Sequence, residues 1–455
     1  MSVFLDYKDI PVVVIGNFAE AHVDFLGRCS DSSERSALVW GEAYHADRIL
    51  LWAGDPKMVI VSFPIVHAEF IRHHLKYPHT EHLAPESPTY HLCKDILRES
   101  HLIEAILAYA GDAKRIQLIP YATTPEFYSL QSALHSQFGL EVLTPESPAP
   151  NDFWLRDYID TKNGFRVLAS QWLQNADDLL PLGVSCYNIE KAIQVADWFS
   201  RRGESCVVKA DTGESGIGTF VIDGTANGLA PEIVEHLSSD PYFSTELIVV
   251  EEYIPAKEQI SPSLEIRVPK LGVGEPHITY VSRQLFLKFG DFCGIQLDKS
   301  LYQTSWYPAL ESSGLQLAKR LQQMGYVGHF DMDCIVRDDG RLYLLEINAR
   351  RTGGTHVHDF ARHFFGEDYI EKASFISYEA MDAGTITDPT ELLEILKEFL
   401  FPMNDEKNYG LVITITRALQ DGRFGCIAVA PTADLALKLQ QDVLAHIRKV
   451  STLIP

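Results

Sequence analysis

The most constraining feature of the sequence is a pair of apolar-rich segments, 331–337 and 341–348, on either side of Asp339-Gly340. Asp-Gly is the residue pair preferred in a two-residue type I′ turn, and the two segments are therefore predicted to form a β-hairpin. Such a turn places Asp338 opposite Arg341 and fixes every other cross-strand pair in the hairpin.

This register places Asp333 opposite Glu346 and Asp331 opposite Asn348, and period-two alternation puts all four side chains on one face. Opposed carboxylates with Cβ atoms about 4.5–5.5 Å apart repel each other unless a cation lies between them. Two carboxylates and an amide oxygen are the hard ligands that suit Mg²⁺ bound to nucleotide phosphates. A solvated acidic sheet face is the alternative interpretation. The apolar residues predicted on the same face weaken it: Ile335, Leu342 and Leu344.

A second segment combines a lysine with a glycine-rich loop. A predicted strand ending at Lys209 leads into a loop with three glycines, 213, 216 and 218, and an apolar strand returns. Glycine lets backbone N–H groups approach an anion, and lysine adds a point charge. The pattern is neither a Walker A motif nor a Rossmann turn. Alone it is often only a flexible turn, but together with the hairpin it predicts a phosphate site.

A third segment, 248–255, is predicted to be a buried strand that ends at Pro255. Backbone groups at the end of such a strand can read an adenine edge, and a nearby carboxylate can hold ribose hydroxyls. An ordinary strand with a charged end fits the same pattern.

In this order, the lysine strand, the glycine-rich loop, the Glu-Glu-Tyr-Ile strand and the Asp…Glu-x-Asn-x-Arg hairpin resemble the ATP-grasp superfamily of carboxylate–amine ligases over residues 155–365. Trp40-Gly41, Ala46-Asp47-Arg48 and Leu51-Trp52 look like the pre-ATP-grasp region of peptide ligases of the pheganomycin type. The resemblance implies a mixed α/β and α+β multidomain fold. Its expected parts are a pre-ATP-grasp α/β domain (1–150), the small lobe (151–255) and large lobe (256–400) of an ATP-grasp fold, and a small C-terminal α+β segment (401–455).

The resemblance also implies roles for single residues. ATP would be bound by Lys162, Lys209, Gly213, Ser215, Gly216, Gly218, the hinge Glu251, Glu252, Tyr253 and Ile254, and the ribose carboxylate Glu258. Mg²⁺, for which Mn²⁺ can substitute, would be held by Asp333, Glu346 and Asn348. Lys209 and an arginine would stabilise the phosphorylated intermediate. Because the sequence reads Asn-Ala-Arg-Arg, both Arg350 and Arg351 are candidates.

The implied reaction joins a carboxylic acid to an amine or peptide through an acyl phosphate. Candidate substrate contacts are Glu265, Arg267, Arg283, Gly353 and Gly354. Arg267 or Arg283 could bind a carboxylate as a bidentate fork, although a surface ion pair fits either residue equally. The alternatives within the same fold are a carboxylase, a phosphoryl-transfer enzyme or a non-catalytic nucleotide-binding regulator.

The rest of the chain indicates an α/β protein. Strands predicted at 12–15, 58–63 and 116–119 alternate with helices, which is typical of a parallel sheet. The proline-rich segment 144–150 is interpreted as a linker. A helix capped by Asn188 follows, and the C-terminus reads as strand, strand and helix.

The amino-acid composition favours some classes of binding partner and one cellular compartment over others. Lys plus Arg number 39 against 62 for Asp plus Glu, a formal charge of −23, which disfavours nucleic acid and anionic membrane surfaces. No apolar run approaches the about 18 residues that a membrane span needs. The seven cysteines form no C-x-x-C pair, which favours a reducing cytoplasm. Small-molecule substrates are therefore the expected partners, and a homodimer is compatible with the resemblance.

Overall fold

The computed structural model describes residues 9–214, 216–244, 247–287, 292–402 and 408–451. The N-terminal part is a five-stranded sheet of order β3-β2-β1-β4-β5, with every neighbouring pair parallel. Its strands are β1 (Val12–Gly16), β2 (Lys57–Val61), β3 (Thr80–Leu83), β4 (Arg115–Pro120) and β5 (Glu141–Leu143). The predicted parallel sheet is confirmed, because buried runs such as all five residues of β2 suit a sheet covered on both faces.

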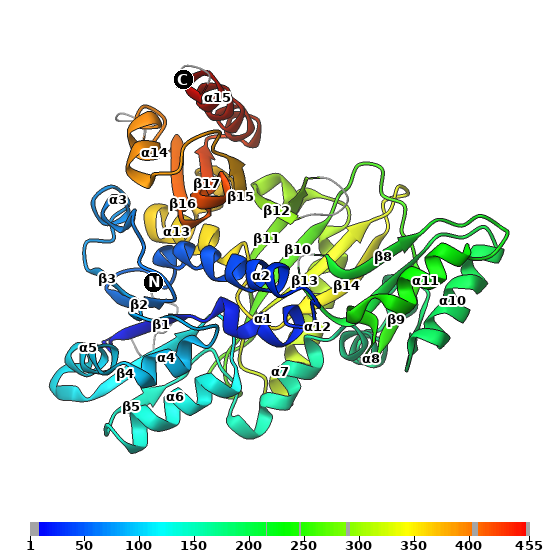
Figure 1. The fold of residues 1–455 in the computed structure, drawn as a ribbon, viewed down its shortest axis with the longest axis horizontal. Helices are drawn as coiled ribbons and strands as arrows, with labels where there is room; N and C mark the ends of the chain where they lie inside the picture. The colour runs from blue at the N-terminus through cyan, green and yellow to red at the C-terminus, as the bar shows by residue number, and fades with distance from the viewer. Residues whose placement is uncertain (1–8, 215, 245–246, 288–291, 403–407, 452–455) are drawn as a thin grey trace.

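Helices pack around this sheet, which lies in the lower left of Figure 1. They are α1 (Phe18–Leu26), α2 (Ser32–Tyr44), η2 (His45–Leu51), α3 (Ala68–His74), α4 (Leu92–Arg98), α5 (Ser100–Ala110), η3 (Gly111–Ala113) and α6 (Pro125–Ser136). Residues 144–149 form neither helix nor strand, as the prolines predict, before η4 (Pro150–Asp152). Glu146 is nevertheless buried, so the linker is packed into the molecule.

The small lobe is built on a four-stranded sheet of order β6-β9-β7-β8. Its strands are β6 (Gly183–Cys186), β7 (Cys206–Glu214), β8 (Ile217–Ile222) and β9 (Ile248–Glu252). Three helices lead into it, α7 (Phe153–Ile159), α8 (Lys162–Trp172) and α9 (Ala176–Leu179); α10 (Ile189–Arg201), α11 (Pro231–Ser239) and η5 (Pro241–Phe243) complete it. The Asn188 side chain accepts a hydrogen bond from the Lys191 amide at 2.9 Å, which confirms the predicted cap.

The remaining strands form one eight-stranded antiparallel sheet of order β14-β13-β10-β11-β12-β15-β17-β16. Its strands are β10 (Pro262–Val268), β11 (His277–Phe286), β12 (Phe292–Leu297), β13 (Gly328–Val336), β14 (Leu342–Asn348), β15 (Ser374–Asp382), β16 (Gly410–Ile415) and β17 (Arg423–Ala430). The C-terminal strands therefore extend the large-lobe sheet.

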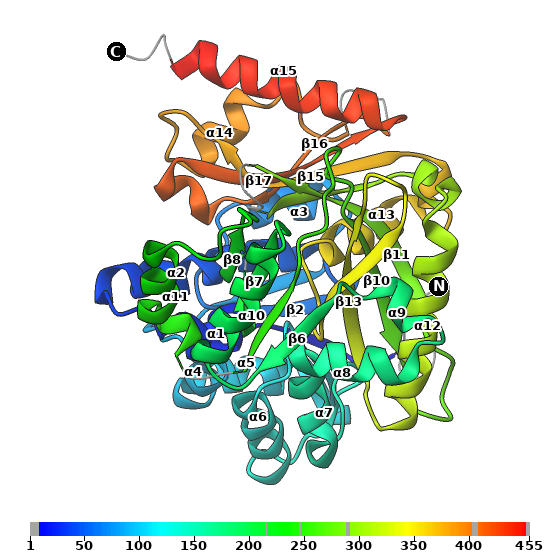
Figure 2. The ribbon, with the colours of Figure 1, turned by 90° about the vertical axis from the view of Figure 1, so that its right-hand side faces the viewer.

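The helices of this part are η6 (Lys299–Gln303), α12 (Tyr307–Gln323), α13 (Thr355–Phe365), η7 (Tyr369–Glu371), α14 (Pro389–Ile395), η8 (Arg417–Asp421) and α15 (Ala433–Ser451). Helix α15 packs on β15 and β17 at the top of Figure 2, where buried residues such as Leu439 and Val443 join the main core. Among the residues that the structure describes, no helix is both long and apolar enough to cross a membrane.

The β13–β14 hairpin has the predicted end pairs but a different turn. Asp331 pairs with Asn348 and Asp333 with Glu346. The Gly340 amide donates to the Arg337 carbonyl at 2.8 Å, and only Gly340 of the Asp-Gly pair has a positive φ. This is a three-residue loop with glycine in the left-handed position, so the predicted type I′ turn is wrong.

A β-bulge at Leu345 compensates for the longer loop. Cys334 pairs with Leu344 while Asp333 pairs with Glu346, which leaves Leu345 as an extra residue. Leu342 and Leu344 consequently pack in the core with Met332, and their predicted place beside the carboxylates is wrong.

Candidate active site

A cavity of about 310 Å³ lies between the β7–β8 hairpin and the β13–β14 hairpin. Many of the residues predicted to bind ATP, metal or substrate line it: Lys162, Lys209, Gly213, Gly216, Asp333, Glu346, Asn348, Arg350, Gly353 and Gly354. Segments almost 200 residues apart in the sequence thus meet around one space.

The first lysine of the cavity comes from the start of α8. The Thr161 side chain caps this helix by accepting from the Gly164 amide at 2.9 Å. Lys162 Nζ lies 2.9 Å from Glu346 Oε2, across the cavity from its own helix. A Cβ atom on Gly213 would lie 3.0 Å from Lys162 Nζ, so a glycine here leaves room for the ammonium group.

The second lysine, Lys209, lies on β7 and forms an ion pair with Glu251 of β9. Glu251 also accepts from Arg166 Nη1 at 3.3 Å. Glu251, at the start of the predicted adenine hinge, therefore forms ion pairs with two cations. The pair with Lys209 holds that lysine at the cavity wall.

The other predicted nucleotide residues that the structure describes are not among those that line this cavity. The Glu252 carboxylate accepts from the Leu182 amide, Tyr253 is 44% exposed and Ile254 is buried. Glu258 is exposed. Gly218 has φ +79° beside Phe25 of α1, and Ser215 lies outside the described residues.

The carboxylates of the hairpin form the acidic side of the cavity. Asp333 accepts hydrogen bonds from Gln284 Nε2 at 2.8 Å and from Asn348 Nδ2 at 3.0 Å. Burial raises the pKa of Asp333 well above its usual range, and the charges of Asp331 and Glu346 add to this effect. A carboxylate whose ionisation is so disfavoured suits a bound divalent cation, which would stabilise its charged form.

Asp331 is a cavity residue that the resemblance did not supply. It accepts from the Ser263 hydroxyl and from Thr352 Oγ1, and burial raises its pKa to about 6. The sequence signal that could have identified Asp331 as a site residue was its predicted position opposite Asn348. Among the described residues, no three His, Cys, Asp or Glu side chains form a metal site by themselves. Two carboxylates and an amide, from Asp333, Glu346 and Asn348, stay the predicted Mg²⁺ ligands.

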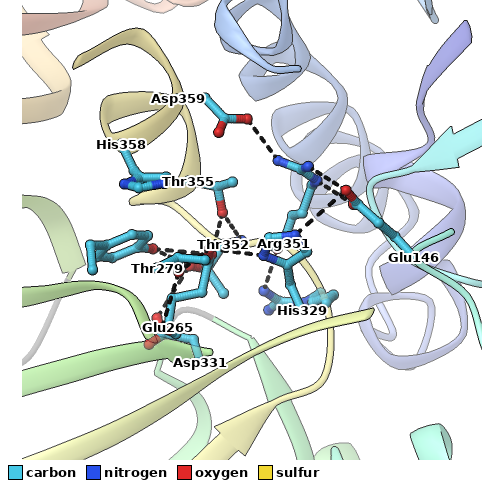
Figure 3. Close-up of polar contacts among 12 residues, drawn as sticks. Glu146, Glu265, Thr279, His329, Asp331, Arg351, Thr352, Thr355, His358 and Asp359 are labelled. Carbon is cyan, nitrogen blue, oxygen red and sulfur yellow. Dashed lines mark hydrogen bonds and ion pairs between the residues drawn. The ribbon is translucent and has the colours of Figure 1, made fainter. Parts of the chain in front are cut away.

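The two adjacent arginines have separate surroundings. Arg350 lines the cavity, and its guanidinium lies 5.4 Å from the centre of the Tyr121 ring. Arg351 is buried; it donates to both Glu146 oxygens at 2.7 Å and to Asp359 at 3.0 Å, as Figure 3 shows. Arg351 therefore joins the linker to α13, and Arg350 is the arginine that faces the site.

The three predicted charged substrate contacts lie outside the cavity. Glu265 is buried and bonds to His329 and Thr355 in the network of Figure 3. Arg267 is buried and lines a second cavity beside the linker. Arg283 donates to the Glu258 carbonyl at 3.2 Å. The neutral residues that do line the site beside Gly353 and Gly354 include Phe286, Phe292 and Ile295, and in the sequence these look like ordinary strand residues.

No protein-family model matches the sequence, and a search of curated proteins finds no relative. Solved structures, in contrast, match almost the whole chain. The N5-carboxyaminoimidazole synthetase of Staphylococcus aureus matches with a TM-score of 0.54 and 12% identity, over 97% of this chain and 98% of that one. The biotin carboxylase of Campylobacter jejuni, solved as a β-γ-ATP complex, gives 0.57 and 12% over 97% and 95%.

A third match is the N5-carboxyaminoimidazole synthase of Aspergillus clavatus in complex with ADP and 5-aminoimidazole ribonucleotide, with a TM-score of 0.53 and 11% identity over 96% of this chain and 99% of that one. The chain has the ATP-grasp fold. At these identities the likeness extends to the fold only. None of the three is a peptide ligase, and the resemblance to the pheganomycin type stays a prediction.

Proposed function

We propose that the protein is an ATP- and Mg²⁺-dependent ligase that activates a carboxylic acid as an acyl phosphate and joins it to an amine or peptide. The observation that carries this proposal is the meeting of three cations, Lys162, Lys209 and Arg350, with the Asp333–Glu346–Asn348 donor set around one cavity. Such a site provides positioning and charge neutralisation, which phosphoryl transfer requires most.

In the first step a carboxylate oxygen of the acid attacks the γ-phosphorus, and the bond to the bridging oxygen of ADP breaks. In the second step the amine nitrogen attacks the acyl carbon, inorganic phosphate leaves and the nitrogen loses a proton. Mg²⁺ held by Asp333, Glu346 and Asn348 would neutralise phosphate oxygens. Lys162 and Lys209 would bind the transferred phosphoryl group, and Arg350 would stabilise the phosphorylated acid.

No protein nucleophile is needed in this scheme. The cysteines agree with this, since all seven are buried and free, and none lines the cavity.

Trapping with hydroxylamine tests the proposal without knowledge of the amine, because it converts acyl phosphates to hydroxamates. Purified protein with Mg·ATP, hydroxylamine and a panel of carboxylic acids should release ADP and form a hydroxamate with at least one acid. Omission of Mg²⁺ should abolish both products. The proposal would be overturned if the protein did not bind ATP, or if none of the acids gave a hydroxamate.

A carboxylase is the second candidate, because the structural matches include biotin carboxylase and N5-carboxyaminoimidazole synthetases. In that case ADP release would depend on bicarbonate, and radioactive bicarbonate would label the product. An amide product with inorganic phosphate distinguishes the ligase.

A further inference from the structure

Every charged residue that lines the cavity belongs to its phosphate and metal part. These residues are Lys162, Lys209, Arg350, Asp331, Asp333 and Glu346. The rest of the described lining is neutral, with polar residues such as Gln284 and Thr352. Its apolar part near Gly353 and Gly354 is formed by Phe292 and Ile295 from β12, and Phe286 from β11 continues it beside Phe292. Phe286 and Phe292 are cross-strand partners with ring centres 6.5 Å apart, and both are only partly buried.

The two glycines bring this apolar surface close to the reactive part of the site. A Cβ on Gly353 would lie 2.9 Å from Glu379 Oε1 and 3.0 Å from Phe292 Cε1. A Cβ on Gly354 would lie 2.5 Å from the Tyr280 hydroxyl oxygen and 2.7 Å from Ile295 Cδ1. Any larger residue would push Phe292 and Ile295, together with these polar groups, away from the backbone that follows Arg350. The apolar side chains therefore contact the backbone three and four residues after Arg350, whose guanidinium would hold the phosphorylated carboxylate.

We propose that Phe286, Phe292 and Ile295 bind the side chain of the acid substrate, which is accordingly an aromatic or branched aliphatic acid of amino-acid size, and that Phe292 selects it. The inference rests on the proposed ligase function. A charged side chain would lose its water here, and among the described residues the charges that line the cavity would be engaged by the phosphates or the metal, while Glu379 beside Gly353 is already paired with Arg48. Burying an apolar side chain against two rings is favourable instead.

The hydroxamate reaction measures this selectivity directly. Phenylalanine and leucine should be activated with kcat/KM at least about tenfold above glycine, glutamate and lysine. Phe292→Ser should lower kcat/KM for phenylalanine about tenfold and leave that for glycine nearly unchanged. Phe292→Leu, which keeps an apolar side chain, should favour leucine over phenylalanine. Phe138→Leu, a partly buried phenylalanine of the N-terminal part, is the matched control and should not change the ranking.

The outcomes separate this inference from the proposed function. Hydroxamate formed preferentially from glutamate or lysine would overturn the inference and leave the ligase standing. An unchanged ranking in both Phe292 variants, or a change confined to the KM of the amine in the complete reaction, would also overturn the inference. No hydroxamate from any acid, with bicarbonate-dependent ADP release, would overturn the ligase and the inference together.

Discussion

Two clusters of buried carboxylates, one in the cavity and one around Arg351, have environments that shift their pKa values in opposite directions. In the cavity, burial raises the pKa of Asp331 to about 6 and raises that of Asp333 well above its usual range. In the buried network, Arg351 keeps the pKa of Glu146 well below its usual range and that of Asp359 at about 2, despite burial. In the second cluster Arg351 lies in direct contact with the carboxylates, whereas in the first the effect of burial exceeds the opposing effect of Arg350.

The difference indicates two different uses of buried charge. The network of Figure 3 connects the linker, the sheet and α13 through contacts such as Arg351–Glu146, which joins residues 205 positions apart. The carboxylates of the cavity are costly to ionise, and a bound cation would make their charged forms favourable. We therefore expect charge in the network to serve stability and charge in the cavity to serve binding.

The largest effect is expected in the cavity. Glu346→Gln removes a proposed metal ligand and the partner of Lys162, and turnover should fall at least about 10³-fold because transition-state charge is no longer neutralised. ADP release with Mg·ATP measures this loss. The thermal unfolding midpoint should stay near that of the wild type, since the amide oxygen can still accept from Lys162, which lines the cavity.

The exposed glutamate Glu394 gives the matched control, because Glu394→Gln removes only a surface pair with Lys397. Retained turnover in Glu346→Gln would contradict the metal assignment.

The next effect is on stability. Arg351→Met leaves Glu146 and Asp359 buried beside an apolar side chain, and the free energy of unfolding should fall by about 3–5 kcal/mol. Urea unfolding measures this loss of free energy, and ATP binding is measured in parallel to show that the folded fraction is native. Arg201→Met breaks the exposed ion pair with Asp197 and should change stability little. Equal losses in the two variants would remove the distinction between network and surface pairs.

Much of the site could be predicted from the sequence, because its elements are local. The hairpin, the lysine strand and the glycine-rich loop each occupy fewer than 20 residues, and the structure brings them to one cavity. The end pairs of the hairpin were correct although the turn was wrong. A longer loop and a bulge at Leu345 shift the register in opposite senses and cancel.

The remaining features depend on distant contacts. Arg350 and Arg351 are chemically identical neighbours, and the positions of Glu146 in the linker and Asp359 in α13 determine which of them is buried. Glu265 and Arg267 alternate on β10 as exposed residues would, yet both are buried beneath α13 and the linker. Phe286 and Phe292 resemble core residues because a partly exposed cavity wall and a core use the same side chains.

The smallest effect distinguishes the two clusters by its sign. Because the folded pKa of Asp331 is raised, its contribution to stability is present below about pH 4 and is lost as the pH rises through about 6. Asp331→Asn should therefore raise the free energy of unfolding by about 1–2 kcal/mol at pH 7.5 and by much less at pH 4. The amide can still accept from Ser263 and donate to Thr352, which keeps the local contacts. Urea unfolding of the wild type and of Asp331→Asn at several pH values measures how the free energy of unfolding changes with pH.

The same substitution in the network should do the reverse. The folded pKa of Asp359 is lowered to about 2, so its contribution is present above about pH 4 and is lost as the pH falls through about 2. Asp359→Asn should consequently destabilise the protein at pH 7.5, where Arg351 loses a charged acceptor, and less so at pH 3. If Mg²⁺ then stabilises the wild type but not Asp333→Asn at pH 7.5, the cavity acids are the binding cluster. If both Asn variants at 331 and 359 destabilise equally at pH 7.5, the cavity charge is structural, and the contrast between the two clusters is wrong.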